Sequence, residues 1–159
     1  MQVLISDANV LIDMEDGQLL ERMFQLPFQF KVSDMLFQDE LSELHPHLLE
    51  FGLVPTELTG ESMVEALRMT RLYVGPSRYD CFALALAKQE ACPLLTGDAA
   101  LRKAAAKEAV LVMGTIWIVE QMVIHGVIDK PEALAAYDRM QAAGSRLPWK
   151  VARSQLHSL

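Results

Sequence analysis

Short apolar runs alternate with longer amphipathic segments along the whole chain. The apolar runs predict strands, at residues 1–5, 28–32, 52–55, 93–96 and 110–113. Apolar side chains at helical spacing predict helices, at residues 13–26, 61–72, 77–87, 99–108, 116–125 and 131–143, and within 35–51 around a break at residues 45–47. Strands that alternate with helices form parallel sheets covered by helices. We therefore predict an α/β protein with a three-layer α/β/α architecture, in which helices flank a central parallel sheet.

Two of the predicted helices differ in how much of their surface should be buried. In helix 61–72 the apolar side chains share one face, opposite charged residues. The expected buried face consists of Met63, Val64, Leu67 and Leu72. Helix 77–87 begins with a capping-box pattern, Ser77-x-x-Asp80, and continues with small apolar residues. We expect it to be buried on nearly all sides.

Chain length and composition narrow the class of protein. The chain has 159 residues, enough for one domain with a substantial core. No apolar run approaches the roughly 18 residues that a membrane span needs, so we expect no membrane association. Asp7 and Asp13 stand where a signal peptide would be basic and apolar, which favours a cytoplasmic protein. Cys81 and Cys92 are expected to be buried thiols and not a disulfide.

Charge is distributed unevenly along the chain. The net charge is −7, which argues against a general nucleic-acid binder. Residues 1–65 hold 13 acidic and 2 basic residues, whereas residues 66–159 hold 8 acidic and 12 basic residues. An acidic half and a basic half can frame a metal site and a polyanionic substrate. The last residues, from Leu147 on, form either a docked arm or a frayed end.

Two of three candidate aspartates occupy positions where a ligand site is expected. Asp7 follows the first predicted strand and Asp98 follows the fourth. The carboxyl ends of parallel strands meet at one edge of a sheet, where ligands bind. Asp98 also stands at a helix N-cap, and Asp80 closes the capping box, so each has a structural role as the alternative.

A further acidic residue is expected from the segment 39–43. Asp39, Glu40 and Glu43 compete for this role. On an α-helix Glu40 and Glu43 share a face, whereas Asp39 points roughly 100° away. The helix register therefore leaves the choice between Glu40 and Glu43 open.

Several motifs resemble, in order, those of the PIN-domain nucleases. The motifs are Ser6–Ile12, Asp39–Leu41, Tyr79–Ala87 and Leu94–Asp98. Gly114-Thr115-Ile116 and Gly126-Val127-Ile128 are also similar to the C-terminal part of bacterial PIN proteins, among them the VapC-type toxins. The resemblance implies a PIN-like nuclease domain over residues 1–146, with residues 147–159 as a C-terminal arm of the same domain.

The resemblance also implies an activity and its residues. Asp7, Glu40, Asp80 and Asp98 would hold Mg²⁺ or Mn²⁺, with Asn9 and Thr96 in support. The implied function is a metal-dependent endoribonuclease that hydrolyses RNA phosphodiesters, the toxin of a toxin–antitoxin pair. The implied partners are RNA, an antitoxin protein and a second copy of the chain in a homodimer.

Elementary chemistry agrees with a metal site. Clustered carboxylates repel one another, and Mg²⁺ and Mn²⁺ accept hard oxygen ligands. Two alternatives are a catalytically silent PIN-like binding protein and a receiver-like signalling module. A receiver needs a lysine after the last core strand, and this chain has Val112-Met113-Gly114-Thr115 there. All four acidic positions are filled, which disfavours the silent protein.

Basic residues and histidines complete the set of candidates. Arg78 precedes Asp80, and Arg102 and Lys103 follow Asp98, so these three are the candidates for phosphate contacts. The alternative is that they are ordinary solvated surface residues. His45 and His47 are the only close histidine pair. The sequence offers no third ligand beside them, so we expect no metal site there.

Overall fold

Five parallel strands form the centre of the computed structural model, which describes residues 1–159. The strand order is β3-β2-β1-β4-β5. The strands are β1 (Gln2–Ser6), β2 (Phe28–Ser33), β3 (Val54–Thr56), β4 (Leu94–Leu95) and β5 (Val112–Met113). β1 pairs with β2 on one side and with β4 on the other. The first strand is therefore central, as its apolar sequence indicates.

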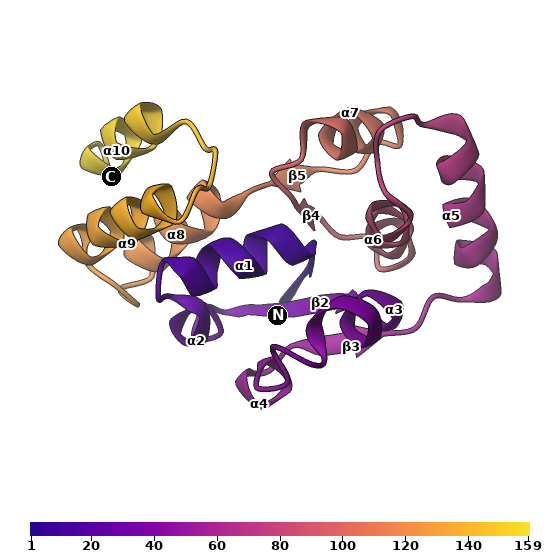
Figure 1. Ribbon diagram of the computed structural model, residues 1–159, viewed down its shortest axis with the longest axis horizontal. Coiled ribbons are helices and arrows are strands. Elements are labelled where there is room, and N and C mark those ends of the chain that lie inside the picture. Colours follow the sequence, from indigo (N-terminus) through magenta and orange to yellow (C-terminus); the bar gives the residue numbers. More distant parts are fainter.

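Helices cover both faces of this sheet (Figure 1). They are α1 (Ala8–Asp16), α2 (Leu20–Met23), α3 (Asp34–Leu36), the π-helix η1 (Phe37–Leu41), α4 (Leu48–Phe51), α5 (Gly60–Leu72), α6 (Arg78–Gln89), α7 (Ala99–Lys107), α8 (Thr115–Ile124), α9 (Lys130–Ala142) and α10 (Trp149–His157). No helix is both long enough and apolar enough to cross a bilayer.

The two faces of the sheet bury separate apolar cores. Leu4 and Leu95 face the larger core, which α1, α8, α9 and α10 enclose. Ile5 and Leu94 face the smaller core beneath α5, α6 and α7. Successive side chains on a strand point to opposite faces, so neighbouring residues of β1 and β4 serve different cores. The predicted three-layer α/β/α architecture is confirmed.

The predicted helix over residues 13–26 is wrong at its start and in its middle. α1 begins at Ala8, because the Asp7 carboxylate accepts a hydrogen bond from the Val10 amide and caps the helix. α1 ends at Asp16, and Gln18 takes a positive φ of 58° before α2 begins. A left-handed residue cannot continue an α-helix, so the segment divides in two.

The buried face of α5 also differs from the prediction. Ser62, Ala66 and Met69 are buried, whereas Val64, Leu67 and Leu72 are exposed. α5 packs against α6, and the small side chains of Ser62 and Ala66 permit a close approach. α6 is buried on nearly all sides, as predicted, from Cys81 to Ala87.

The two cysteines are free thiols, as expected from the sequence. Cys81 is buried, and Cys92 is half-buried. Burial raises the pKa of both thiols to about 11, because a thiolate is poorly solvated away from water. Neither side chain is therefore a nucleophile at neutral pH.

The C-terminal arm is docked and not frayed. α10 buries Trp149, Ala152 and Leu156, which belong to the larger core. The Trp149 ring packs against Tyr137 of α9, with ring centroids 5.6 Å apart. Figure 1 shows α10 lying along α9 at the end of the molecule opposite α5.

A pair of substitutions tests this docking. Leu156 is fully buried, whereas Val151 on the same helix is 52% exposed. We expect Leu156→Ala to lower the free energy of unfolding by about 2–5 kcal/mol, through lost burial and the cavity that it leaves. Val151→Ala should change it by about 0.5 kcal/mol or less. Urea unfolding measures both, and equal effects would contradict the docked arrangement.

Candidate functional site

A residue with a hydroxyl side chain lies at or just after the carboxyl end of every strand of the sheet. These residues are Ser6, Ser33, Thr56, Thr96 and, two residues after β5, Thr115. Four of them are buried, with Thr56 half-buried. A hydroxyl both donates and accepts, so it can satisfy neighbouring polar groups at a sheet edge without adding charge. Ser33, for example, caps α3 by accepting from the Leu36 amide.

Asp7 lies at the centre of this edge and is only 4% exposed. Its backbone N–H donates to the carbonyl of Leu95, which continues the pairing of β1 with β4. One carboxylate oxygen accepts from the Val10 amide at 2.9 Å, and the other accepts from the Thr96 hydroxyl at 2.5 Å. The position of the Asp7 carboxylate is thus fixed by two elements of the fold.

A cavity of about 310 Å³ opens beside Asp7. Its walls include Asp7, Asn9, Glu40, Ser77, Tyr79 and Asp80. The structure therefore brings together four of the residues predicted from the sequence, from three separate parts of the chain. No Lys, Arg or His lines this cavity, so its carboxylates have no basic partner there.

The helix-borne acidic residue that faces the cavity is Glu40, and Glu43 does not line it. The segment Phe37–Leu41 is a π-helix, closed by the hydrogen bond from the Ser42 amide to the Phe37 carbonyl at 2.7 Å. An i→i+5 helix does not have the α-helical register that makes Glu40 and Glu43 equivalent. Asp39 is separately engaged, because its carboxylate accepts from the Tyr79 hydroxyl.

Asp80 combines a structural contact with its place in the cavity. Its carboxylate accepts from the Ser77 amide at 2.9 Å, and its own amide donates to the Ser77 hydroxyl at 3.1 Å. This is the capping box predicted from the sequence. The side chain is half-buried at the cavity wall, so the cap sets its position without removing it from the site.

Asp98 stands slightly apart from the other three acidic residues. It caps α7 by accepting from the Leu101 amide at 2.8 Å, and it does not line the cavity. Its amide donates to the Thr96 hydroxyl at 3.1 Å, and the same hydroxyl donates to Asp7. Thr96 therefore links Asp98 to Asp7 through one oxygen atom.

The electrostatics of the site are dominated by Asp7. The pKa of this carboxyl is raised from 3.8 to about 6, mainly by burial, with smaller contributions from the nearby charges of Asp80 and Asp13. Hydrogen bonds from Thr96 and Val10 act in the opposite direction. Asp13 also has a raised pKa, mainly through burial, and accepts from the Thr115 hydroxyl at 2.8 Å.

The donors around the cavity fit a hard divalent cation. The strong ligand atoms are all oxygens, from three carboxylates and the Asn9 amide. No Lys, Arg or His side chain lines the cavity to pair with these carboxylates in place of a cation. The carboxylates do not converge within 4.8 Å of one another as a set. Mg²⁺ retains several waters and is commonly held by only one or two carboxylates, so a looser arrangement suits it.

Basic residues lie around this edge of the sheet in different roles. Arg102 donates to the Thr96 carbonyl at 3.1 Å. Together with Arg146 it lines a second cavity of about 440 Å³, in which Glu120 is the only acidic residue. Lys103 is exposed and lines neither cavity. Arg78 is exposed and lies over the Tyr79 ring, 5.2 Å from its centroid.

Three residues near the site were not among the sequence candidates. Tyr79 lines the acidic cavity, Arg146 lines the second cavity, and Asp13 contributes charge near Asp7. The aromatic neighbour of Asp80 was a usable signal for Tyr79. Arg146 lies 48 residues after Asp98, and only the tertiary fold brings it near. Asp13 lies in α1, six residues after Asp7, so the helix itself keeps it close.

Comparison with known proteins identifies the family of the chain. The sequence profile of the PIN-domain family matches residues 3–159, nearly the whole chain. No curated protein matches the chain. PIN domains are generally nucleases that use divalent metal ions, in keeping with the carboxylates around the cavity. The chain belongs to the PIN-domain family.

Proposed function

We propose that this protein is a Mg²⁺- or Mn²⁺-dependent endoribonuclease. The observation that carries the proposal is the cavity at the carboxyl ends of β1 and β2, where Asp7, Glu40 and Asp80 meet without a basic residue. Unpaired carboxylates are costly in a partly buried site unless a cation balances them. Membership of the PIN-domain family supports nuclease activity.

In this proposal Asp7, Glu40, Asp80 and Asp98 hold the cation, and Asn9 adds an amide oxygen. When bound, a divalent cation stabilises the negative charge that develops on a phosphodiester and makes water easier to deprotonate. Thr96 acts as a positioning residue, because its hydroxyl fixes Asp7 and receives the amide of Asp98. The caps of α6 and α7 hold Asp80 and Asp98 in place.

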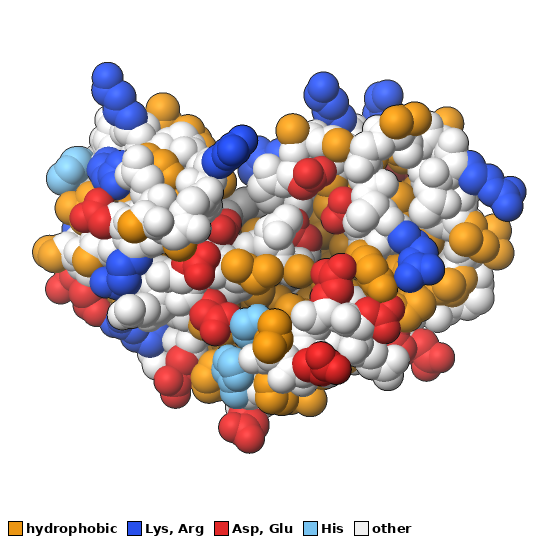
Figure 2. Space-filling model, in the orientation of Figure 1, with side chains coloured by type: hydrophobic (Ala, Val, Ile, Leu, Met, Phe, Trp, Pro, Cys, Tyr) orange, Lys and Arg blue, Asp and Glu red, His pale blue; other side chains and the backbone are white.

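The surroundings of the cavity support a polyanionic substrate. Arg102 and Arg146 line the neighbouring cavity, and the basic side chains there can contact phosphates. On the other side, Arg78 and Tyr79 offer a cation and an aromatic face for a stacked base. Figure 2 shows Lys and Arg side chains on both rims of the hollow between α10 and α7, with Asp and Glu side chains deeper in it. We therefore favour single-stranded RNA as the substrate.

Not every basic residue near the site is available for phosphate. Arg68 pairs with Glu65 and Glu108, and Lys88 pairs with the same two carboxylates. These four side chains form a closed ion-pair network near the C-terminal end of α6. The exposed Lys103 contributes only to the general positive field around α7 in this proposal.

We extend the proposal to a toxin that is blocked by an antitoxin and acts as a homodimer. The order of the motifs, including the Gly114-Thr115-Ile116 start of α8, supports this reading. The exposed Val64, Leu67 and Leu72 on α5 offer apolar surface for a protein partner. These partners rest on the resemblance and stay predictions.

Direct cleavage of RNA tests the activity. We expect the protein to cut single-stranded RNA with Mn²⁺ or Mg²⁺ present and not with EDTA. Asp80→Asn keeps the oxygen that caps α6 but removes the charge, and should lower the cleavage rate by at least about a hundredfold. Glu132→Gln is the matched control, because Glu132 occupies the same capping-box position on α9. Metal-independent cleavage, or RNA binding without cleavage, would contradict the proposal.

A second pair of variants tests which residue of the π-helix segment serves the site. Glu40 and Glu43 are both exposed acidic residues, three positions apart, but only Glu40 lines the cavity. We expect Glu40→Gln to lower the metal-dependent rate by about tenfold or more, with Glu43→Gln close to wild type. Initial cleavage rates at several Mn²⁺ concentrations measure both. The reverse order would move the ligand to Glu43.

In this proposal protons and metal compete for the Asp7 carboxylate, so the free energy of unfolding should depend on pH. The folded pKa of about 6 lies above the ordinary value of 3.8, so the folded protein binds more protons than the unfolded chain between these values. Stability without metal therefore falls as the pH rises through this range and levels off above about pH 6. The size of this component is up to about 3 kcal/mol.

The variant Asp7→Asn removes the contribution of Asp7 to the pH dependence of stability. Asparagine keeps an oxygen for the Val10 amide and carries no charge, so in EDTA its free energy of unfolding should lack the fall between about pH 4 and pH 6. Above about pH 6, Mn²⁺ should stabilise the wild type more than Asp7→Asn, because metal binds the ionised carboxylate. Urea unfolding over this pH range, with and without Mn²⁺, measures both effects. Parallel pH curves for the two proteins would contradict the assignment.

A further inference from the structure

A second group of potential metal ligands lies near the C-terminal end of α1, whereas the acidic cavity lies at its start. Its members are Glu15 of α1, His45 in the link between η1 and α4, and His47 at the start of α4. One ligand atom from each residue lies within 4.8 Å of those of the other two. The sequence shows the two histidines as a pair, and the fold supplies the third ligand from 30 residues earlier. The expectation that the pair has no third ligand is therefore wrong.

The contact between His45 and Glu15 is not an ordinary hydrogen bond. The His45 Nδ1 atom lies 2.9 Å from a carboxylate oxygen of Glu15. That nitrogen is buried, yet the angles allow it no hydrogen bond with any partner. A buried polar atom without a partner is costly and calls for an explanation. Two ligands of a single ion have this relation, since adjacent donors around a metal at about 2.0–2.1 Å lie side by side, about 3 Å apart.

The surroundings suit a bound transition-metal ion. The apolar side chains of Leu11, Leu20, Leu41 and Leu48 enclose the His45 and Glu15 side chains on the protein side. Low polarity around a site strengthens metal–ligand attraction. The His47 ring packs edge-on against Phe51, with centroids 5.3 Å apart, which limits the orientations of the ring.

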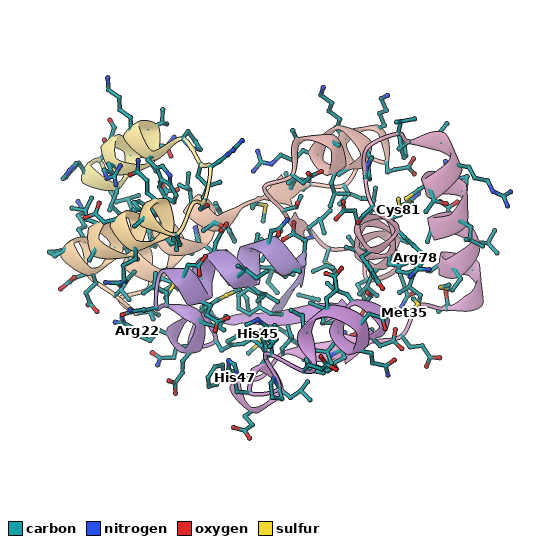
Figure 3. The ribbon with its side chains drawn as sticks, viewed as in Figure 1. Arg22, Met35, His45, His47, Arg78 and Cys81 are labelled. Carbon is teal, nitrogen blue, oxygen red and sulfur yellow. The ribbon has the colours of Figure 1, made fainter.

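The outer side of the group remains open to water. His45 and His47 are half-buried, and Glu15 is exposed. Figure 3 shows both labelled histidines below α1 on the front of the molecule, and Figure 2 shows two histidine side chains adjacent on that surface. Three protein ligands with an open fourth position are the pattern of a water-accessible zinc site.

We propose that Glu15, His45 and His47 bind a Zn²⁺-class transition-metal ion, with water as a further ligand. Imidazole nitrogen suits Zn²⁺, Ni²⁺ and Cu²⁺, whereas Mg²⁺ and Mn²⁺ prefer oxygen donors. This site is therefore chemically distinct from the carboxylate cavity. It does not depend on the proposed nuclease activity.

The position of the site gives the ion a structural role. It joins α1, which Asp7 caps, to the link after η1, and η1 itself carries Glu40. Bound metal fixes the distance between these two segments and stabilises the folded state over the unfolded chain. The metal thus acts as a clamp beside the acidic cavity.

The test uses the full chain with Asp7→Asn as the parent, so that the carboxylate cavity is weakened as a competing site. ZnCl₂ is titrated by calorimetry at about pH 7.5, and CoCl₂ serves as a probe whose visible absorption reports nitrogen coordination. Glu15→Gln and His47→Ala each remove one ligand. His157→Ala is the matched control, because His157 is an exposed histidine on α10. Thermal unfolding in EDTA checks that every variant is folded.

We expect one Zn²⁺ per parent chain and a rise in melting temperature that MgCl₂ does not reproduce. Loss of a direct ligand should weaken binding by more than the roughly 10–100-fold that loss of an outer-shell partner costs. The control should bind as the parent does. If the parent takes up no Zn²⁺, or if Glu15→Gln and His47→Ala bind as tightly as His157→Ala, the group is only a His–Glu contact and the proposal fails. Loss of RNA cleavage in the wild type would leave this result unaffected.

Discussion

The hydrogen bond from the Thr96 hydroxyl to the Asp7 carboxylate is the contact on which the site depends. It joins the ends of β1 and β4, two adjacent strands at the middle of the sheet. The same carboxylate caps α1, and the same threonine receives the amide of Asp98 and, at its carbonyl, the guanidinium of Arg102. One buried contact therefore sets the positions of two helices, of both cavities and of the acidic residues between them.

Paired charges elsewhere in the molecule show what is unusual about this site. Glu65 and Glu108 share Arg68 and Lys88, and the basic partners lower the pKa of Glu65 to about 2. Asp7 has no such partner, and its pKa is raised and not lowered. Natural proteins accept destabilising arrangements of this kind where function requires them. The absence of a base leaves the carboxylates of the cavity free for the cation of the proposed function.

Local signals in the sequence predict part of the fold and of the candidate site, whereas the rest depends on tertiary packing. Alternating apolar and amphipathic runs predict the sheet, and the position of Asp7 after the first strand predicts its place at the sheet edge. The place of Asp80 in the cavity is expected only from the resemblance to PIN domains. The register of Glu40 was beyond prediction, because a π-helix breaks the periodicity on which the argument relied. The exposed face of α5 was misassigned because contact with α6 selects small side chains over large ones. Glu15 was missed as a partner of His45 because only folding brings α1 to that segment.

From the sequence, capping and metal binding are alternative roles for Asp80 and Asp98, but the geometry makes the two roles compatible. Each carboxylate has two oxygens, and each of these two residues uses one oxygen for a backbone amide at a helix start. The other oxygen accepts no hydrogen bond from the protein and stays available to a ligand. A helix N-terminus also carries partial positive charge, which offsets repulsion among neighbouring carboxylates without a basic side chain that would displace a cation. Helix caps can thus hold acidic residues together at the end of a parallel sheet, and the capping role becomes part of the site.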